Sequence, residues 1–281
     1  MGSGDGYFPR GRSVLRRVQG ERAVGLLYGQ RALMIGALNP LNFVGTIENT
    51  YARDTPFQRL AHTGLAFETI FFGDRGEADE VLARVRRLHE RVRGELPADA
   101  GRFEAGTPYS AMDPELMLWT VAVMMDSAET FYDLLVRRLE PAEREALWQD
   151  YLRFAELFGM PREAAPATYA GFRSYWDDRI ASDELHLTSE ARETGFATAF
   201  EIPMPAIYGP LSRVHNMIML GSLPPRVREI YGLSWATAQQ LAFDAAVTAV
   251  RTSRPLVPKR VRRGRNGDSF ELVARTERAR A

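Results

Sequence analysis

The chain contains no cysteine, and this absence removes several kinds of chemistry at once. Without a thiol there is no disulfide, thiolate nucleophile, cysteine-ligated zinc, iron–sulfur cluster or thiolate-ligated haem. Histidine is also scarce, with 4 residues in a chain of 281. Any metal would therefore have to be bound by these few histidines, by carboxylates, by tyrosine or by methionine.

A net charge of one sign and a long hydrophobic run are missing as well. The 36 basic and 36 acidic residues cancel, so the overall charge points to neither nucleic acid nor an anionic membrane as a partner. The longest mainly apolar stretch, residues 116–125, is shorter than the ~20 residues that cross a membrane, so we expect a core helix and no transmembrane segment. Residues 1–13 lack the apolar segment and cleavage site of a secretory signal, which predicts a cytoplasmic protein.

Several catalytic and cofactor-binding motifs are absent from the chain. It has no His-Glu-x-x-His, no phosphate-binding glycine loop, no dinucleotide fingerprint after a strand and no Gly-x-Ser-x-Gly. Asp183 and His186 have the spacing of half a di-iron site, but such a site needs a second copy of the motif, and there is none. These absences exclude zincins, nucleotide-binding enzymes and α/β-hydrolases.

Helical periodicity runs through most of the chain, whereas the alternation typical of strands does not recur. Side-chain caps and prolines mark the starts of several of the helices, and glycine or proline marks their ends. Residues 94–110 are rich in glycine and proline and predict a long loop. The predicted helices lie at residues 20–38, 56–72, 77–93, 114–139, 141–158 and 235–250, with a further run that Thr168 caps and that continues through Trp176. The pattern predicts an all-α fold.

The 45% hydrophobic content is enough for one large core and predicts a single helical domain at residues 20–252. Before it we expect a flexible segment, residues 1–19, and after it a basic, disordered tail, residues 253–281. Within that tail, residues 259–265 form a basic cluster that could contact nucleic acid or anionic lipid. It has no interleaved aromatic residues, so the pattern favours a solvated end and no nucleic-acid partner.

His89 is the first candidate functional residue, because it lies within the broad apolar face of the predicted helix 77–93, between Val85 and Val92. That face consists of Val81, Leu82, Val85, Leu88 and Val92. One interpretation is a buried neutral histidine that is hydrogen-bonded to a carbonyl group. The other is a metal ligand. The spacing alone favours the first interpretation and leaves the second open.

A second candidate group lies in the preceding helix, where Arg59, His62 and Thr63 occupy positions i, i+3 and i+4. These positions share one side of a helix, so the three side chains could converge on a small ligand. The alternative is a solvent-facing arginine beside a hydroxyl that is bonded to the preceding helical turn. The spacing alone favours this alternative.

Six phrases of the sequence, spread over about residues 22–242, carry a family resemblance. They are DTPFQRLAHT, FFG, HERVRG, YSAMDPELMLW, FAELFGMP and GSLPPRVREIYGLSW, in this order. The chain thereby resembles the helical oxygenases that include the latex-clearing rubber oxygenases and the fungal MpaB-type oxygenases. The resemblance implies a globin-like helical core around a haem b, with iron bound by His89 as the proximal ligand.

The same resemblance places Arg59 and Thr63, as catalytic residues, on the oxygen-binding side of the haem. His62 shares their side of the helix and is a candidate for a second axial ligand when no substrate is bound. The implied reactants are dioxygen and a hydrophobic small molecule of the alkene or terpenoid class, with residues 116–125 on the substrate side. The electron donor is not identified by the sequence.

This chain departs from the family pattern at two positions. Relatives carry histidines where it has Val121 and Asn49. Glu48 is the nearest candidate for a general base. The alternative to an oxygenase is a non-catalytic, all-helical protein that binds a hydrophobic ligand and has lost the haem.

Overall fold

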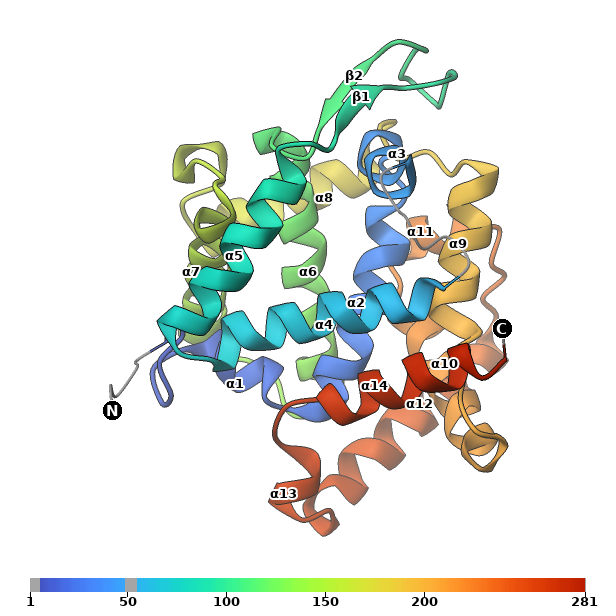
Figure 1. Ribbon diagram of the computed structural model, residues 1–281. Coiled ribbons are helices and arrows are strands. Elements are labelled where there is room, and N and C mark those ends of the chain that lie inside the picture. The colour runs from blue at the N-terminus through green and yellow to red at the C-terminus, as the bar shows by residue number, and fades with distance from the viewer. Residues whose placement is uncertain (1–5, 49–54, 281) are drawn as a thin grey trace.

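The structure, a computed structural model, describes residues 6–48 and 55–280, which form fourteen α-helices and one small hairpin (Figure 1). About 70% of the described residues are helical, so the prediction of one mainly helical domain is confirmed. The helices are α1 (Val14–Gln19), α2 (Arg22–Gly36), α3 (Pro40–Glu48), α4 (Pro56–Phe72), α5 (Arg75–His89), α6 (Pro114–Leu135), α7 (Pro141–Phe158), α8 (Tyr169–Ala181), α9 (Ser189–Phe200), α10 (Gly209–Ser222), α11 (Pro225–Ile230), α12 (Thr237–Ser253), α13 (Lys259–Arg262) and α14 (Gly267–Arg278).

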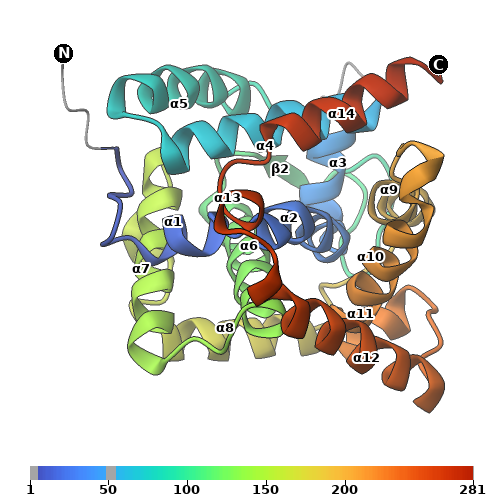
Figure 2. The same ribbon diagram turned by 90° about the horizontal axis from the view of Figure 1, so that it is seen from below.

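Helices α2 and α6 form the centre of the molecule. Figure 2 looks at the molecule from below and shows these two helices surrounded by α4, α5, α7, α8 and α12. Nearly every residue of α6 is buried, and the indole nitrogen of Trp119 donates a hydrogen bond to the carbonyl oxygen of Gly36 in α2 at 3.2 Å. The apolar sequence of α6 thus makes it a core helix, as predicted. None of the helices that the structure describes is both long and apolar enough to cross a membrane.

The central helices also bury an ion pair that the sequence pattern did not predict. Arg31 of α2 and Asp126 of α6 are 2% and 6% exposed and form an ion pair at 2.7 Å. Arg31 donates further hydrogen bonds to the hydroxyl of Ser127 and the carbonyl oxygen of Ser222, and Arg173 of α8 contacts the other carboxylate oxygen of Asp126. A buried charge is tolerated only when it is paired in this way, so the network holds α2, α6, α8 and the end of α10 in one arrangement.

The sequence predicted several helix ends correctly, because those ends depend on local chemistry. Asp113 caps α6 by accepting hydrogen bonds from the backbone of the first turn, and Thr168 caps α8 in the same way. Helix α7 ends at Gly159, whose φ of 100° lies in the left-handed region that favours glycine.

Two expectations were wrong: that the chain has no strands, and that its N-terminal segment is flexible. Residues Arg93–Glu95 (β1) and Pro108–Ser110 (β2) pair as an antiparallel hairpin inside the predicted loop. Residues 14–19, expected to be flexible, form α1, in which Leu15 and Val18 are fully buried. Both segments are too short to show a clear period in the sequence.

Helix α5 ends earlier than predicted, and His89 is its last residue rather than an interior one. The broad apolar face assigned to this helix is also narrower. Leu88, expected on that face, is 43% exposed, while Val81 and Leu82 are buried. The chain leaves the helix at His89 because it turns into the hairpin.

Residues 253–280 do not form the disordered tail that their composition suggests. They contain α13 and α14, and α14 packs antiparallel against α4 (Figures 1 and 2). Each helix caps the other: the carboxylate of Glu68 in α4 accepts from the backbone nitrogen of Asn266 before α14, and that of Glu277 in α14 accepts from the backbone nitrogens of Phe57 and Gln58 in α4. Negative charge at a helix N-terminus stabilises the helix, so the two helices support one another.

The close packing of α4 on α14 requires a glycine at position 64. A Cβ atom there would lie 2.6 Å from the ring of Phe270. We therefore expect Gly64→Ala to lower the free energy of unfolding by about 1–3 kcal/mol through overpacking. Gly29→Ala in α2 is the matched control, because its Cβ would meet nothing within 4 Å. In chemical denaturation the control should be neutral or stabilising by up to about 1 kcal/mol. Equal effects of the two substitutions would contradict the predicted clash.

Candidate functional site

Two of the candidate residues lie on a face of α4 that continues into the interior of the fold. Arg59, Thr63, Ala66 and Ile70 occupy positions i, i+4, i+7 and i+11 and so share one side of the helix. Ile70 is fully buried in the core. Nearer the start of α4, the same face is only partly covered, because α4 and α5 diverge from the loop that joins them (Figure 1). Arg59 and Thr63 therefore lie on the continuation of a core-facing stripe.

Arg59 is half-buried, and its guanidinium group has no ion pair or hydrogen bond with any residue that the structure describes. Burial lowers the pKa of Arg59 below its ordinary value, but an arginine stays charged at neutral pH. A partly desolvated cation without a partner is costly. It is also what a site that receives negative charge would contain.

Thr63 and His62 are exposed. The hydroxyl of Thr63 donates a hydrogen bond to the carbonyl oxygen of Arg59 at 3.1 Å, which is the local bond that the spacing favoured. This bond uses the proton of the hydroxyl and leaves its oxygen able to accept. His62 lies on a neighbouring line of the same helix, so the structure brings all three α4 candidates to one side.

His89 combines burial with an absence of partners. Its Nδ1 atom is buried and has no hydrogen-bond partner, so the carbonyl bond expected of a structural histidine is not found among the described residues. Burial lowers the pKa of the His89 imidazole below its ordinary value of 6.5, so the ring is neutral at pH 7. A neutral imidazole with a free nitrogen is the form that binds a metal.

Phe158, the last residue of α7, contacts residues of both α5 and α4. Its ring stacks on the His89 ring with centroids 6.1 Å apart, and the ring of Phe67 in α4 meets it edge-on at 6.3 Å. Phe67 lies one turn after Thr63 on α4. Phe158 thus contacts both His89 of α5 and, one turn after Thr63, Phe67 of α4. We call Arg59, Thr63, Phe67, His89 and Phe158 the His89 site.

These aromatic contacts were not foreseen from the sequence. Phe67, Phe154 and Phe158 form a cluster of rings, with Phe154 and Phe158 at 4.8 Å. Their spacing of four residues in α7 is typical of any buried helix face and carried no functional signal. Only the packing of α7 against both α4 and α5 shows that Phe158 contacts both His89 and Phe67.

Other residues expected at the site are placed differently. Residues 116–125, expected on the substrate side, are buried against other core residues, apart from the exposed Thr120. Val121, at a family histidine position, is 5% exposed within this core. Asn49 and the side chain of Glu48 lie outside the described residues. The predicted roles of these two residues stay predictions.

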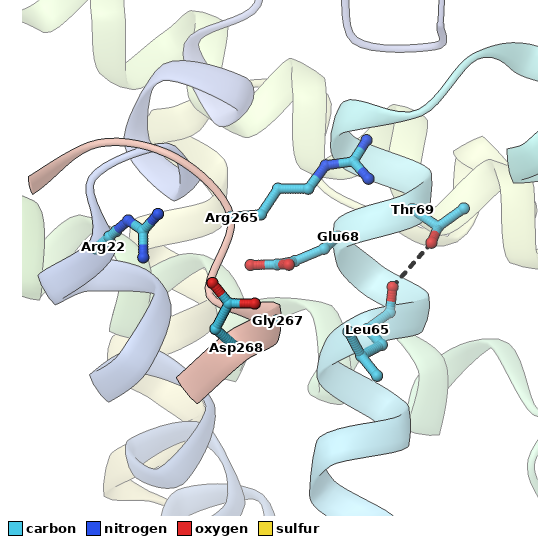
Figure 3. Close-up of a pocket in the computed structure, with 7 residues that line it drawn as sticks. All are labelled: Arg22, Leu65, Glu68, Thr69, Arg265, Gly267 and Asp268. Carbon is cyan, nitrogen blue, oxygen red and sulfur yellow. Dashed lines mark hydrogen bonds between the residues drawn. The ribbon is translucent and has the colours of Figure 1, made fainter. Parts of the chain in front are cut away.

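A pocket of about 340 Å³ lies near the opposite face of α4 and is drawn in Figure 3. Its lining is mainly charged. Glu68 points between Arg265 and the pair Arg22 and Asp268, and the hydroxyl of Thr69 is turned back to the carbonyl oxygen of Leu65 at 2.9 Å. Glu68 already caps α14, and its burial raises the pKa of this carboxyl group. Such a polar pocket is unsuited to a hydrophobic substrate.

The described residues contain no group of three or more histidine, aspartate or glutamate side chains that could hold a bare metal ion. Asp183, half of the rejected di-iron motif, pairs with Arg102 at the surface. His89 is therefore a single imidazole donor in an aromatic setting. A metal held there would need its other ligands from a prosthetic group, as in haem, where one imidazole suffices.

Comparison with known proteins gives a family match over most of the chain. The family described as "ER-bound oxygenase mpaB/B'/Rubber oxygenase, catalytic domain" matches residues 16–252. Two similar proteins, one from Mycobacterium bovis and one from Mycobacterium tuberculosis, are each described as uncharacterized. Each is 27% identical over 209 residues, which cover 73% of this chain and 77% of the relative. No solved structure matches the chain.

Proposed function

Because the chain belongs to the family of MpaB and rubber oxygenase catalytic domains, we propose that it is a haem b-dependent oxygenase. It would act with dioxygen on a hydrophobic molecule of the alkene or terpenoid class. The single observation that supports this most strongly is His89, a half-buried imidazole whose Nδ1 atom is buried and has no hydrogen-bond partner among the described residues. The globin-like arrangement of the helices around the haem is part of the same proposal.

The residues of the His89 site fit a haem. His89 would hold the iron, and the rings of Phe158 and Phe67 would offer apolar contact to the macrocycle. When bound, the haem supplies the redox chemistry with dioxygen, which no side chain of this protein can supply. The protein then has to bind and orient the reactants and to polarise dioxygen.

Arg59 and Thr63 would perform the polarising role. The guanidinium group of Arg59 is a positive charge without a partner among the described residues, and it would stabilise negative charge developing on a bound reactant. The hydroxyl of Thr63 offers a lone pair on the same face and becomes a donor if it releases the carbonyl oxygen of Arg59. His62, exposed beside them, would be a second ligand only while no substrate is bound.

The proposed substrate is hydrophobic because the known walls of the site are aromatic. Phe67 and Phe158 present rings rather than polar groups between α4 and α5. Apolar walls with a few fixed polar groups are typical of sites that bind apolar small molecules. In this arrangement Arg59 and Thr63 are the polar groups that would set the position of the reaction.

The experiment that tests the proposal is the visible absorption spectrum of the purified protein, before and after dithionite. A haem protein with an imidazole ligand shows a Soret band that shifts on reduction. We expect this band either directly after purification or after titration with haemin. A colourless protein that takes up no haemin would exclude the oxygenase and leave the non-catalytic hydrophobic-ligand-binding protein as the better account.

The role of Arg59 can be tested without a known substrate. We expect Arg59→Gln to lower the reduction potential of the bound haem by tens of millivolts, because one partly screened positive charge near the iron is removed. The charge-conserving Arg59→Lys is the matched control and should keep most of the potential. Spectroelectrochemical titration measures both variants. Equal potentials in wild type and Arg59→Gln would remove Arg59 from the haem surroundings.

A further inference from the structure

A corner at the end of α12 has no role in the proposed oxygenase. It comprises residues 251–263, namely the end of α12, the 3-10 turn Arg254–Leu256 and α13, and we call it the basic knuckle. In Figure 1 the basic knuckle lies at the bottom of the molecule, beyond the other helices, and in Figure 2, seen from below, α13 lies in front of the central helices. It therefore protrudes on one side of the fold.

The basic knuckle is held in place at both ends by one buried carboxylate. Glu21 is 2% exposed, and it accepts from the guanidinium groups of Arg254 at 2.8 Å and Arg263 at 2.7 Å. The backbone nitrogen of Gly264 also donates to the carbonyl oxygen of Gly20 at 3.0 Å. A loop fixed at both stems presents its tip without the entropy cost of ordering it on binding.

The tip that this arrangement presents is apolar. Leu256 is 85% exposed and Val261 is 55% exposed. Pro255 and Pro258 lie beside Leu256 and are exposed as well. Single exposed apolar residues are common on protein surfaces. Here two lie close in sequence on one protruding corner, Leu256 at the end of the 3-10 turn and Val261 in α13, and exposed apolar groups that gather in one place mark interaction sites.

Free cations surround this tip. Arg251, Lys259 and Arg260 are exposed and take part in no ion pair with any residue in the described ranges. No acidic residue occurs between Asp244 and Asp268 in the sequence. The charges of Lys259 and Arg260 are therefore not neutralised locally, whereas Arg254 and Arg263 are held by Glu21 and the charge of Arg251 acts on the carboxylate of Asp133 in α6.

We propose that the basic knuckle docks the protein on the surface of an anionic lipid bilayer. Leu256 and Val261 enter the boundary between head groups and acyl chains, and Arg251, Lys259 and Arg260 contact lipid phosphates. Apolar residues ringed by cations are what interfacial membrane binding requires. Nucleic acid shares the preference for cations, but it offers no apolar layer to the exposed leucine, and the knuckle has no aromatic ring to stack on a base.

The test is co-sedimentation of the full-length protein with vesicles of phosphatidylcholine alone or mixed with phosphatidylglycerol. We expect binding to the mixed vesicles that weakens as salt is added, and little binding to phosphatidylcholine. Lys259→Gln combined with Arg260→Gln should weaken binding about 25-fold, at roughly fivefold for each charge. Leu256→Ser should weaken it about tenfold, because the apolar contact is lost.

Ile207→Ser is the matched control, because Ile207 is 83% exposed but lies outside the basic knuckle. This variant should bind as the wild type does. The proposal is overturned if the protein ignores phosphatidylglycerol vesicles, or if Ile207→Ser weakens binding as much as Leu256→Ser. Tight binding to a DNA duplex that Leu256→Ser leaves unchanged would also overturn it, in favour of a nucleic-acid site. None of these results depends on whether haem is bound.

Discussion

Replacement of His89 by alanine is expected to abolish stable haem binding, the largest effect predicted for a single side chain of this protein. The imidazole is the one metal donor of the His89 site, and its Nδ1 atom is buried without a partner. Without an axial ligand, only the apolar contacts of Phe67 and Phe158 would retain the macrocycle. We expect the Soret band of purified His89→Ala to fall to a small fraction of the wild-type intensity, measured together with total haem extracted into pyridine.

Two comparisons separate ligation from general disruption. His186→Ala removes another half-buried histidine, one that lies outside the His89 site, and should keep the full haem content. Added free imidazole should restore haem to His89→Ala, because it can occupy the space left by the ring. A His89→Ala variant that keeps a wild-type spectrum would show that another residue holds the iron, and His62 would then be the next candidate.

The second large effect is on stability. We expect Asp126→Ala to lower the free energy of unfolding by about 3–5 kcal/mol, because the substitution leaves the guanidinium group of Arg31 buried without a counter-charge. The side chain of Arg31 is 3% exposed, so water cannot replace the lost carboxylate. Denaturation in guanidinium chloride, followed by circular dichroism, measures this change.

Asp177→Ala is the matched control for Asp126→Ala. Asp177 also pairs with an arginine, Arg173, but its side chain is 70% exposed, and exposed pairs of this kind contribute about 0–1 kcal/mol. The double variant Arg31→Met with Asp126→Leu should recover part of the lost stability, since it removes both buried charges. Equal losses for Asp126→Ala and Asp177→Ala would contradict the account of the network.

Local chemistry explains which parts of the fold could be predicted from the sequence. The ends of α7 and the start of α8 depend on Pro141, Gly159 and Thr168, which act on their own turns. The centrality of α6 follows from its mainly apolar sequence at residues 116–125. These features need no knowledge of distant residues, so the sequence predicts them directly.

The wrong predictions share a different cause. The basic composition after residue 252 suggested disorder. Glu21, more than 200 residues earlier, instead neutralises Arg254 and Arg263. The ring of Phe270 packs against Gly64. Leu88 was assigned to an apolar face that the fold leaves uncovered. Composition and periodicity show which side chains of a segment are suited to burial. Whether they are buried depends on residues elsewhere in the chain.

The candidate site divides in the same way. The sequence by itself determined that α4 is a helix, that Arg59 and Thr63 share one of its faces, and that His89 is one of only four possible imidazole ligands. The tertiary structure alone decided that Phe158 contacts both His89 and Phe67, and that neither the Nδ1 atom of His89 nor the guanidinium group of Arg59 has a partner among the described residues. The reason is physical: helix formation and side-chain chemistry are local, whereas burial and pairing depend on how α4, α5 and α7 pack together.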